Sequence, residues 1–374
     1  MKKIFIVVNV DWFFLSHRKE IALAAKKTGY DVTIVTNNTG MKPAIEGLGL
    51  KVIDLPMSRS GKNIFEELST LNFLYKLYKR EQPDVIHHVG LKTILWGTFA
   101  AKLAKIKGIA NAVSGLGIIF SEENSSILSK IFIQILRYSH HRNNLAVIFQ
   151  NDEDKTLFLS NHIIREDQAF MIKGSGVDLN QFCYTPEPVD GKIKVLLTAR
   201  MIAEKGIFFL AEAANLLKSE YRDKVQFLLC GGIDDNPNAI READLKAVCD
   251  GEYVSWLGYR TDVLNLLKSS HIVAFPSYYK EGLPKSLIEG TAIGRPIITT
   301  NSIGCKETVI EGYNGFLIPI KNSKVLAERL KQLFDDTQLR ISMGKNSRLL
   351  AEKDFSIENV ITKHLEIYKQ LTTN

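Results

Sequence analysis

The chain has 374 residues, of which 45% are hydrophobic and 24% are charged, and its formal net charge at pH 7 is +7. This composition is typical of a soluble globular protein and excludes disordered and fibrous classes. At roughly 150 residues per domain, the length predicts two domains.

The positive charge lies in the first part of the chain. Residues 1–150 carry 20 Lys and Arg against 11 Asp and Glu, a net +9, whereas the other 224 residues carry 28 against 30, a net −2. This asymmetry favours an anionic partner such as phospholipid, nucleic acid or a pyrophosphate. A basic, solvated face without a partner is the alternative.

Three features favour a cytosolic protein without a membrane-spanning segment. The longest apolar runs, such as residues 4–8, are far shorter than the roughly 18 residues that a spanning helix needs. Asn9 and Asp11 interrupt the first run, so we expect a buried strand there and not a signal peptide. The four cysteines form no C-x-x-C pair, which fits reduced thiols.

Short β-branched runs alternate with longer amphipathic segments along the chain, which predicts parallel sheets flanked by helices. In the first half we expect strands at residues 4–9, 31–36, 51–55, 84–88, 108–113, 146–150 and 169–173, and helices at 17–28, 64–80, 91–107 and 126–141. In the second half we expect strands at residues 192–198, 225–230, 253–256, 272–275 and 296–300, and helices at 207–219, 238–249, 262–269, 284–293 and from 324 onward.

Between the halves, residues 184–191 hold two prolines and a glycine, which predicts a linker. We expect an N-terminal domain at 1–185, a linker at 186–192 and a C-terminal domain at 193–374, whose last helix can cross back to the first domain. Both are expected to be doubly wound, Rossmann-like α/β domains, with ligands bound between them beyond the carboxyl ends of the strands.

Two motifs follow expected strands of the second half. Arg200 lies where one strand ends and Lys205 lies where the next helix begins, which together suit a diphosphate. Two surface cations in an ordinary loop are the alternative. Glu281 and Glu289 flank the start of another helix, where carboxylates can accept hydrogen bonds from neighbouring sugar hydroxyls. Gly282 between them lets a ligand approach the main chain.

Arg200 with Lys205, followed by Glu281 and Glu289, resembles the donor-site signature of the retaining family-four glycosyltransferases, which have the GT-B fold of two Rossmann-like domains facing across a cleft. The resemblance covers essentially the whole chain. It extends to Gly176-Val177-Asp178, Phe182, Gly231-Gly232, Glu307 and Asn314-Gly315.

The resemblance implies roles for these positions. Arg200 and Lys205 would hold the diphosphate of a nucleotide-sugar, Glu289 the ribose hydroxyls, and Glu281 the donor sugar, which makes Glu281, Arg200 and Lys205 the expected catalytic residues. The other expected donor contacts are Gly232, Gly282 and Leu283. The sugar would be transferred with retention of configuration and without a metal or other cofactor, and UDP is the expected nucleotide.

Other positions resemble a subgroup that builds bacterial surface polysaccharides, such as capsule and O-antigen, on lipid carriers. Lys92 and Gly117 carry this resemblance, and His17 is a candidate contact of the acceptor or donor sugar, with a structural role as its alternative. The family's glycine pair is absent from the first strand-to-helix loop, and Val89 replaces its second histidine. We expect no metal at His87-His88 or His140-His141, because adjacent histidines point different ways. Asp234-Asp235 is interpreted as turn and helix-cap chemistry.

Residues 126–142 form an apolar segment with basic residues toward its end. A helix there could lie at the surface of an anionic membrane or pack in the domain core.

The sequence thus predicts a glycosyltransferase of the hexosyl or N-acetylhexosaminyl type. Its expected partners are a nucleotide-sugar and a glycan acceptor linked to a lipid diphosphate, met at the cytoplasmic face of the inner membrane. A nucleotide-sugar epimerase and a non-catalytic scaffold of a polysaccharide assembly complex are the alternatives. A dehydrogenase is disfavoured because the first strand lacks a G-x-G-x-x-G turn, and nucleic-acid binding because no aromatic-basic motif accompanies the charge.

Overall fold

The computed structural model describes residues 1–57, 64–115, 127–234 and 239–373. These form two compact units, which are described separately. The first comprises Met1–Ser175 and Ile357–Asn374, and the second comprises Gly176–Ser356. Residues 176–192, which include the expected linker, therefore pack with the second unit, and the last helix packs with the first.

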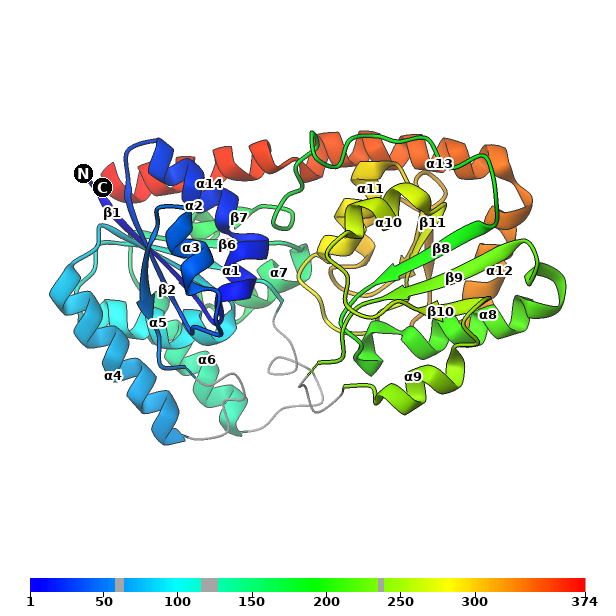
Figure 1. The fold of residues 1–374 in the computed structure, drawn as a ribbon. Helices are drawn as coiled ribbons and strands as arrows, with labels where there is room; N and C mark the ends of the chain where they lie inside the picture. The colour runs from blue at the N-terminus through cyan, green and yellow to red at the C-terminus, as the bar shows by residue number, and fades with distance from the viewer. Residues whose placement is uncertain (58–63, 116–126, 235–238, 374) are drawn as a thin grey trace. The chain divides into compact units, whose positions relative to one another are not determined.

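The first unit is built on a seven-stranded parallel sheet in the order β3-β2-β1-β4-β5-β6-β7 (Figure 1). Its strands are β1 (Lys3–Val8), β2 (Asp31–Thr36), β3 (Lys51–Asp54), β4 (Val85–Val89), β5 (Gly108–Ala112), β6 (Leu145–Phe149) and β7 (Ala169–Met171). Its helices are α1 (Asp11–His17), α2 (Lys19–Lys27), α3 (Lys42–Gly47), α4 (Ile64–Glu81), α5 (Leu91–Leu103), α6 (Ile127–His140), α7 (Asp152–Ser160) and α14 (Ile357–Thr373).

Side chains that alternate along β1 divide the core of this unit into two layers. Phe5 and Val7 pack under α4, α5 and α6, whereas Ile4, Ile6 and Val8 pack against α2 and α14. This period of two, with both faces apolar, is what a parallel strand buried between helices requires.

The second unit has a six-stranded parallel sheet in the order β10-β9-β8-β11-β12-β13. Its strands are β8 (Ile193–Thr198), β9 (Val225–Cys230), β10 (Val254–Trp256), β11 (Ile272–Phe275), β12 (Ile297–Thr300) and β13 (Gly315–Ile318). Its helices are α8 (Ile207–Tyr221), α9 (Glu242–Val248), α10 (Val263–Ser269), α11 (Lys285–Ile293), α12 (Ser323–Asp335) and α13 (Thr337–Leu350), the last followed by a π-helical turn at Ala351–Phe355.

The expected α/β class and strand alternation are confirmed, whereas several local predictions are wrong. The sequence missed α3, α7 and β13, which are short. The expected helix at 17–28 corresponds to α2, and the separate helix α1, which begins at Asp11 and ends at His17, was not expected. The buried carboxylate of Asp11 accepts hydrogen bonds from the main-chain N–H groups of Trp12, Thr39 and Met41, at 2.8, 2.6 and 2.9 Å, which fixes this start.

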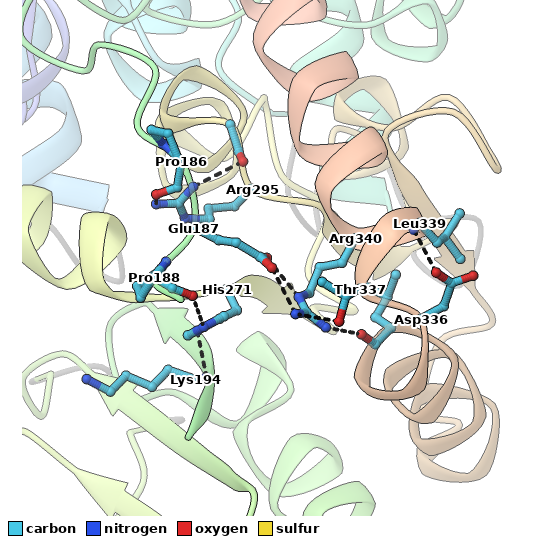
Figure 2. A network of polar contacts seen from close by, with 12 residues as sticks. Pro186, Glu187, Pro188, Lys194, His271, Arg295, Asp336, Thr337, Leu339 and Arg340 are labelled. Atoms are coloured by element: carbon cyan, nitrogen blue, oxygen red, sulfur yellow. Dashed lines mark hydrogen bonds and ion pairs between the residues drawn. The ribbon is translucent and has the colours of Figure 1, made fainter. Parts of the chain in front are cut away.

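Buried polar side chains hold residues 185–188 against the rest of the second unit (Figure 2). The Arg340 guanidinium donates to both carboxylate oxygens of Glu187, at 2.7 and 2.8 Å. The fully buried Arg295 donates to the carbonyl of Thr185 at 2.6 Å, and its burial lowers its pKa to about 10. His271 bonds to the carbonyl of Pro188 at 3.1 Å. Such bidentate and main-chain contacts hold this segment in one geometry.

Among the described residues, the structure contains no helix that is both long and apolar enough to cross a membrane.

Four buried histidines lie inside the first unit: His87, His88, His140 and His364. His88 bonds through Nδ1 to Asn111 at 2.9 Å and through Nε2 to the Tyr78 hydroxyl at 3.1 Å. Burial lowers the pKa of His88 to about 3, that of His140 to about 4 and that of His364 to about 3. These side chains are therefore neutral in the folded protein.

We predict that acid destabilises the first unit below the ordinary histidine pKa. Between about pH 6.5 and about pH 4 the unfolded chain binds protons that the folded chain does not, so the free energy of unfolding falls as the pH falls. The measurement is the urea midpoint as a function of pH. His364→Met should flatten this dependence, while His141→Gln, at an exposed position, should leave it unchanged. Equal pH dependence in His364→Met and the natural protein would contradict the interpretation.

Candidate functional site

Two loops of the second unit are fixed to each other beyond the carboxyl ends of β8 and β11, which are neighbours in the sheet. Gly206 has a φ of +80°, and a Cβ there would lie 2.1 Å from the carbonyl oxygen of Pro276. Only glycine accommodates this approach. The main-chain N–H of Tyr278 also donates to the carbonyl of Glu204 at 2.9 Å.

This approach brings Lys205 and Glu281 into contact. The Lys205 ammonium donates a hydrogen bond to Glu281 Oε1, and the two side chains are only 10% and 13% exposed. The Ser277 hydroxyl donates to the same oxygen at 3.3 Å, and the Lys205 Nζ lies 5.3 Å from the centre of the Tyr279 ring. A largely desolvated ion pair therefore lies where both strands end.

Arg200 lies on the same loop as Lys205 and points to a different carboxylate. Its Nη1 donates to Asp234 Oδ2 at 2.6 Å, with Arg200 43% exposed and Asp234 only 8% exposed. The prediction of helix-cap chemistry is wrong for Asp234, because α9 begins later, at Glu242, after Arg241. Asp235 lies outside the described residues.

The glycine pair lines this loop. Gly231 has a φ of +154°, and a Cβ there would lie 1.6 Å from the carbonyl oxygen of Ala199. Its own carbonyl accepts a hydrogen bond from the Trp256 indole at 2.9 Å. Gly232 lies beside the exposed Tyr259, whose Cβ would be 3.5 Å from a Cβ at Gly232.

The second glutamate lies inside α11. Glu289 is 14% exposed, and its Oε1 lies 3.7 Å from the Lys285 ammonium. Burial raises the pKa of the Glu289 carboxyl, while Lys285 acts in the opposite direction. A buried carboxylate has lost most of its hydration, so hydrogen bonds from a ligand would stabilise it strongly.

Another glycine, Gly304, packs closely against the main chain between the two glutamates. Gly304 has a φ of +81°, and a Cβ there would lie 2.0 Å from the carbonyl oxygen of Gly282. Leu283 is buried in a small apolar cluster. Pro284 takes the N-cap position of α11, so the helix begins one residue later than the expected range of 284–293.

The structure thus brings Lys205 and Glu281 together and places Arg200 on the Lys205 loop. Sequence reasoning missed the supporting residues Ser277, Tyr279 and Gly304, and the partner role of Asp234. Ser277 and Tyr279 directly precede the Glu281 motif after β11, which is the only signal that could have identified them.

The candidate residues of the first unit, His17 and Lys92, contact different neighbours. His17 ends α1 and does not open a helix, and its ring stacks on Phe13 with ring centres 4.2 Å apart. Lys92, in the first turn of α5, forms an ion pair with Glu67 at 2.6 Å. Glu67 also accepts a hydrogen bond from the Trp96 indole. Gly117 lies outside the described residues.

Three members of the histidine pairs, His87, His88 and His140, are buried in the first unit, whereas His141 is exposed. His87 bonds to the Tyr368 hydroxyl at 2.6 Å, and His140 Nε2 bonds to the Asn111 amide at 2.9 Å. No group of three or more potential metal-ligating side chains is found in the part of the chain that the structure describes.

Comparison with known proteins decides the family. The profile described as "Glycosyl transferases group 1" matches residues 186–350, and "Glycosyl transferase 4-like" matches residues 3–151. A Campylobacter jejuni relative, N,N'-diacetylbacillosaminyl-diphospho-undecaprenol alpha-1,3-N-acetylgalactosaminyltransferase, is 31% identical, with 96% of this chain and 99% of the relative covered. The chain belongs to this family of glycosyltransferases.

Other relatives agree with this assignment. The glycosyltransferase is 24% identical to an Escherichia coli UDP-Gal:alpha-D-GlcNAc-diphosphoundecaprenol alpha-1,3-galactosyltransferase, over 92% of this chain and 90% of the relative. The structure of Anabaena HepE in complex with UDP has the same fold, with a TM-score of 0.77, 19% identity and coverage of 98% and 99%. The fold of this glycosyltransferase is therefore GT-B.

We predict that Asp234 competes with anionic ligands for Arg200. Asp234→Asn removes one carboxylate from a partly exposed ion pair, so the affinity for UDP should rise about two- to fivefold, as expected for a pair worth up to about 1 kcal/mol. Isothermal titration calorimetry measures this. Asp244→Asn is the matched control, because Asp244 pairs with the exposed Arg241 in a similar contact at 2.8 Å. Weaker UDP binding by Asp234→Asn would contradict competition.

Proposed function

We propose that this glycosyltransferase moves a sugar, with retention of configuration, from a UDP-sugar to a glycan linked to a lipid diphosphate, in the synthesis of a bacterial surface polysaccharide. The observation that carries the proposal is the desolvated Lys205–Glu281 pair beside Arg200. It offers two cations for a diphosphate and one carboxylate for a sugar.

Donor binding would rearrange these charges. The cations of the site are held by the carboxylates of Glu281 and Asp234. A diphosphate carries more negative charge than a carboxylate and accepts several hydrogen bonds, so it would take over contacts with Arg200 and Lys205. Glu281 would then accept hydrogen bonds from hydroxyls of the donor sugar.

Other residues would complete the donor site. Glu289 would accept hydrogen bonds from the ribose hydroxyls, and Gly232, which has no side chain, would let the nucleotide approach the main chain beside Tyr259. Gly282 and Leu283 would offer their main-chain N–H groups near the donor sugar. The bound UDP of HepE, a protein with the same fold, supports the choice of nucleotide.

The acceptor follows from the relatives and from the charge of the first 150 residues. The printed names of the Campylobacter and Escherichia relatives specify sugars linked to diphosphoundecaprenol. A lipid diphosphate would suit the net +9 of residues 1–150 and would place the enzyme at the cytoplasmic face of the inner membrane. His17, Lys92 and Gly117 stay candidate contacts of the acceptor or donor sugar, and the transferred group is a hexose or an N-acetylhexosamine.

The chemistry requires stabilisation of a leaving diphosphate. As the bond between the sugar C1 and the phosphate oxygen breaks, negative charge grows on that oxygen, and Arg200 and Lys205 would stabilise it. The acceptor hydroxyl oxygen forms the new bond to C1 from the same face, and its proton passes to the leaving phosphate oxygen. Two protein cations would thus do what a metal ion does in other transferases, so chelation by EDTA should leave turnover unchanged.

We predict that substitution of Glu281 lowers turnover without weakening nucleotide binding, whereas substitution of Lys205 weakens nucleotide binding. Glu281→Gln should lower turnover of the UDP-sugar by at least about 100-fold while UDP affinity is kept or increased, because the amide cannot accept the same hydrogen bonds and no longer neutralises Lys205. Lys205→Ala should weaken UDP binding by about tenfold or more. Calorimetry with UDP and steady-state kinetics provide the two readouts.

Lys331→Ala is the matched control, because Lys331 pairs with Glu220 at 2.6 Å on the exposed surface of the same unit. It should change neither quantity. Failure of every UDP-sugar and GDP-sugar to bind the natural protein would reject the proposal and favour a scaffold.

A further inference from the structure

Helix α6 presents apolar side chains to solvent. Its described part buries only Leu136, Ser139 and His140, of which two are polar. By contrast, Ile131 is 49% exposed and Tyr138 is 55% exposed. A helix that covers a core normally has the opposite pattern, with its apolar stripe turned inward.

The exposed side chains of α6 line a groove shared with α5. The groove has a volume of about 390 Å³ and is lined by Phe99, Lys130, Ile131, Gln134, Ile135 and Tyr138. Ile131, Ile135 and Tyr138 recur at helical spacing, and the Phe99 and Tyr138 rings lie 5.8 Å apart. We call these six residues the α5–α6 groove.

Lys130 lines this groove, and basic residues far outnumber acidic ones in the sequence that forms it. From residue 91 to residue 151 the sequence has only Glu122 and Glu123 as acidic residues. The same stretch has seven cationic side chains: Lys92, Lys102, Lys105, Lys107, Lys130, Arg137 and Arg142. The Lys102 ammonium lies 3.9 Å from the centre of the Tyr138 ring, so a cation and an aromatic ring share one end of the groove.

We propose that the α5–α6 groove docks on the surface of an anionic lipid bilayer. An apolar stripe enters the boundary between headgroups and acyl chains, while flanking lysines stay among anionic headgroups. The positive charge favours a bilayer over a protein partner, because the centre of a stable protein interface is depleted of charged residues, lysine in particular. Tyr138 beside Lys102 fits the aromatic and basic anchors found at such a boundary.

This inference adds a membrane partner to the proposed function, because docking would bring the first unit to the surface that holds a lipid-linked acceptor. Its test does not depend on that function. Vesicle binding needs neither a donor nor an acceptor. The protein could therefore transfer sugar without binding vesicles, or bind vesicles without transferring sugar.

The test is flotation of the full chain with phosphatidylcholine vesicles, with and without phosphatidylglycerol. The natural protein should bind only the anionic vesicles, and salt should weaken binding. The double variant Ile131→Ser/Tyr138→Ser should bind at least about tenfold more weakly, because two anchoring side chains are lost. Lys130→Gln should weaken binding several-fold, since each basic residue contributes about 1 kcal/mol near an anionic surface.

Controls with equal exposure lie in the second unit. Leu216→Ser/Leu349→Ser removes two side chains that are 50% and 54% exposed, and Lys345→Gln removes an exposed lysine of α13. Both should bind vesicles like the natural protein. UDP affinity, measured on every variant, should stay constant and reports that the chain is folded.

Three results would overturn the inference. The natural protein could ignore anionic vesicles, or the Ile131→Ser/Tyr138→Ser variant could bind them as well as its control does. Alternatively, light scattering could reveal a dimer of the natural protein that this double variant abolishes, which would make the groove an interface between two copies of the chain.

Discussion

The ion pair between Lys205 and Glu281 is the interaction on which the candidate site depends. Both side chains are largely removed from water, and such a pair persists only where further contacts offset the lost hydration. Ser277 supplies one of these contacts, and the ring of Tyr279 supplies another. An anionic ligand that binds Lys205 therefore competes with Glu281 for this cation, and it keeps the cation paired when it takes the place of the carboxylate.

The fold sets this geometry through strand order. Because β8 and β11 are adjacent and parallel, the loops that follow them leave the same edge of the sheet side by side. The close approach of Gly206 to Pro276 then removes the remaining freedom between these loops. The position of Gly304 under Gly282 does the same for the loop that carries Glu281. The ion pair thus depends on close packing of main-chain atoms at Gly206 and Gly304, which a larger residue would prevent.

Much of this could be predicted from the sequence, since the signals are local. Strands such as β2, β9 and β11 were predicted with their observed bounds, because buried parallel strands are short apolar runs flanked by polar residues. Arg200, Lys205 and Glu281 were identified because each follows such a strand. The resemblance to a glycosyltransferase family gave them roles that spacing alone does not provide.

The rest depends on contacts between distant positions. Nothing near Asp234 indicates that its carboxylate meets Arg200, 34 positions earlier. Similarly, main-chain N–H groups of residues 39 and 41 donate to the carboxylate of Asp11 in the first turn of α1, a contact that no local pattern reveals. His17 was consequently assigned to the start of a helix that it ends.

The most direct measurement of the central claim is transfer of a radiolabelled sugar from a UDP-sugar to a polyprenyl-diphosphate-linked saccharide, with release of UDP quantified in the same reaction. We predict that one labelled sugar enters the lipid fraction, with retained anomeric configuration, for each UDP released. Conversion of the UDP-sugar into an isomer without acceptor and without UDP release would contradict it.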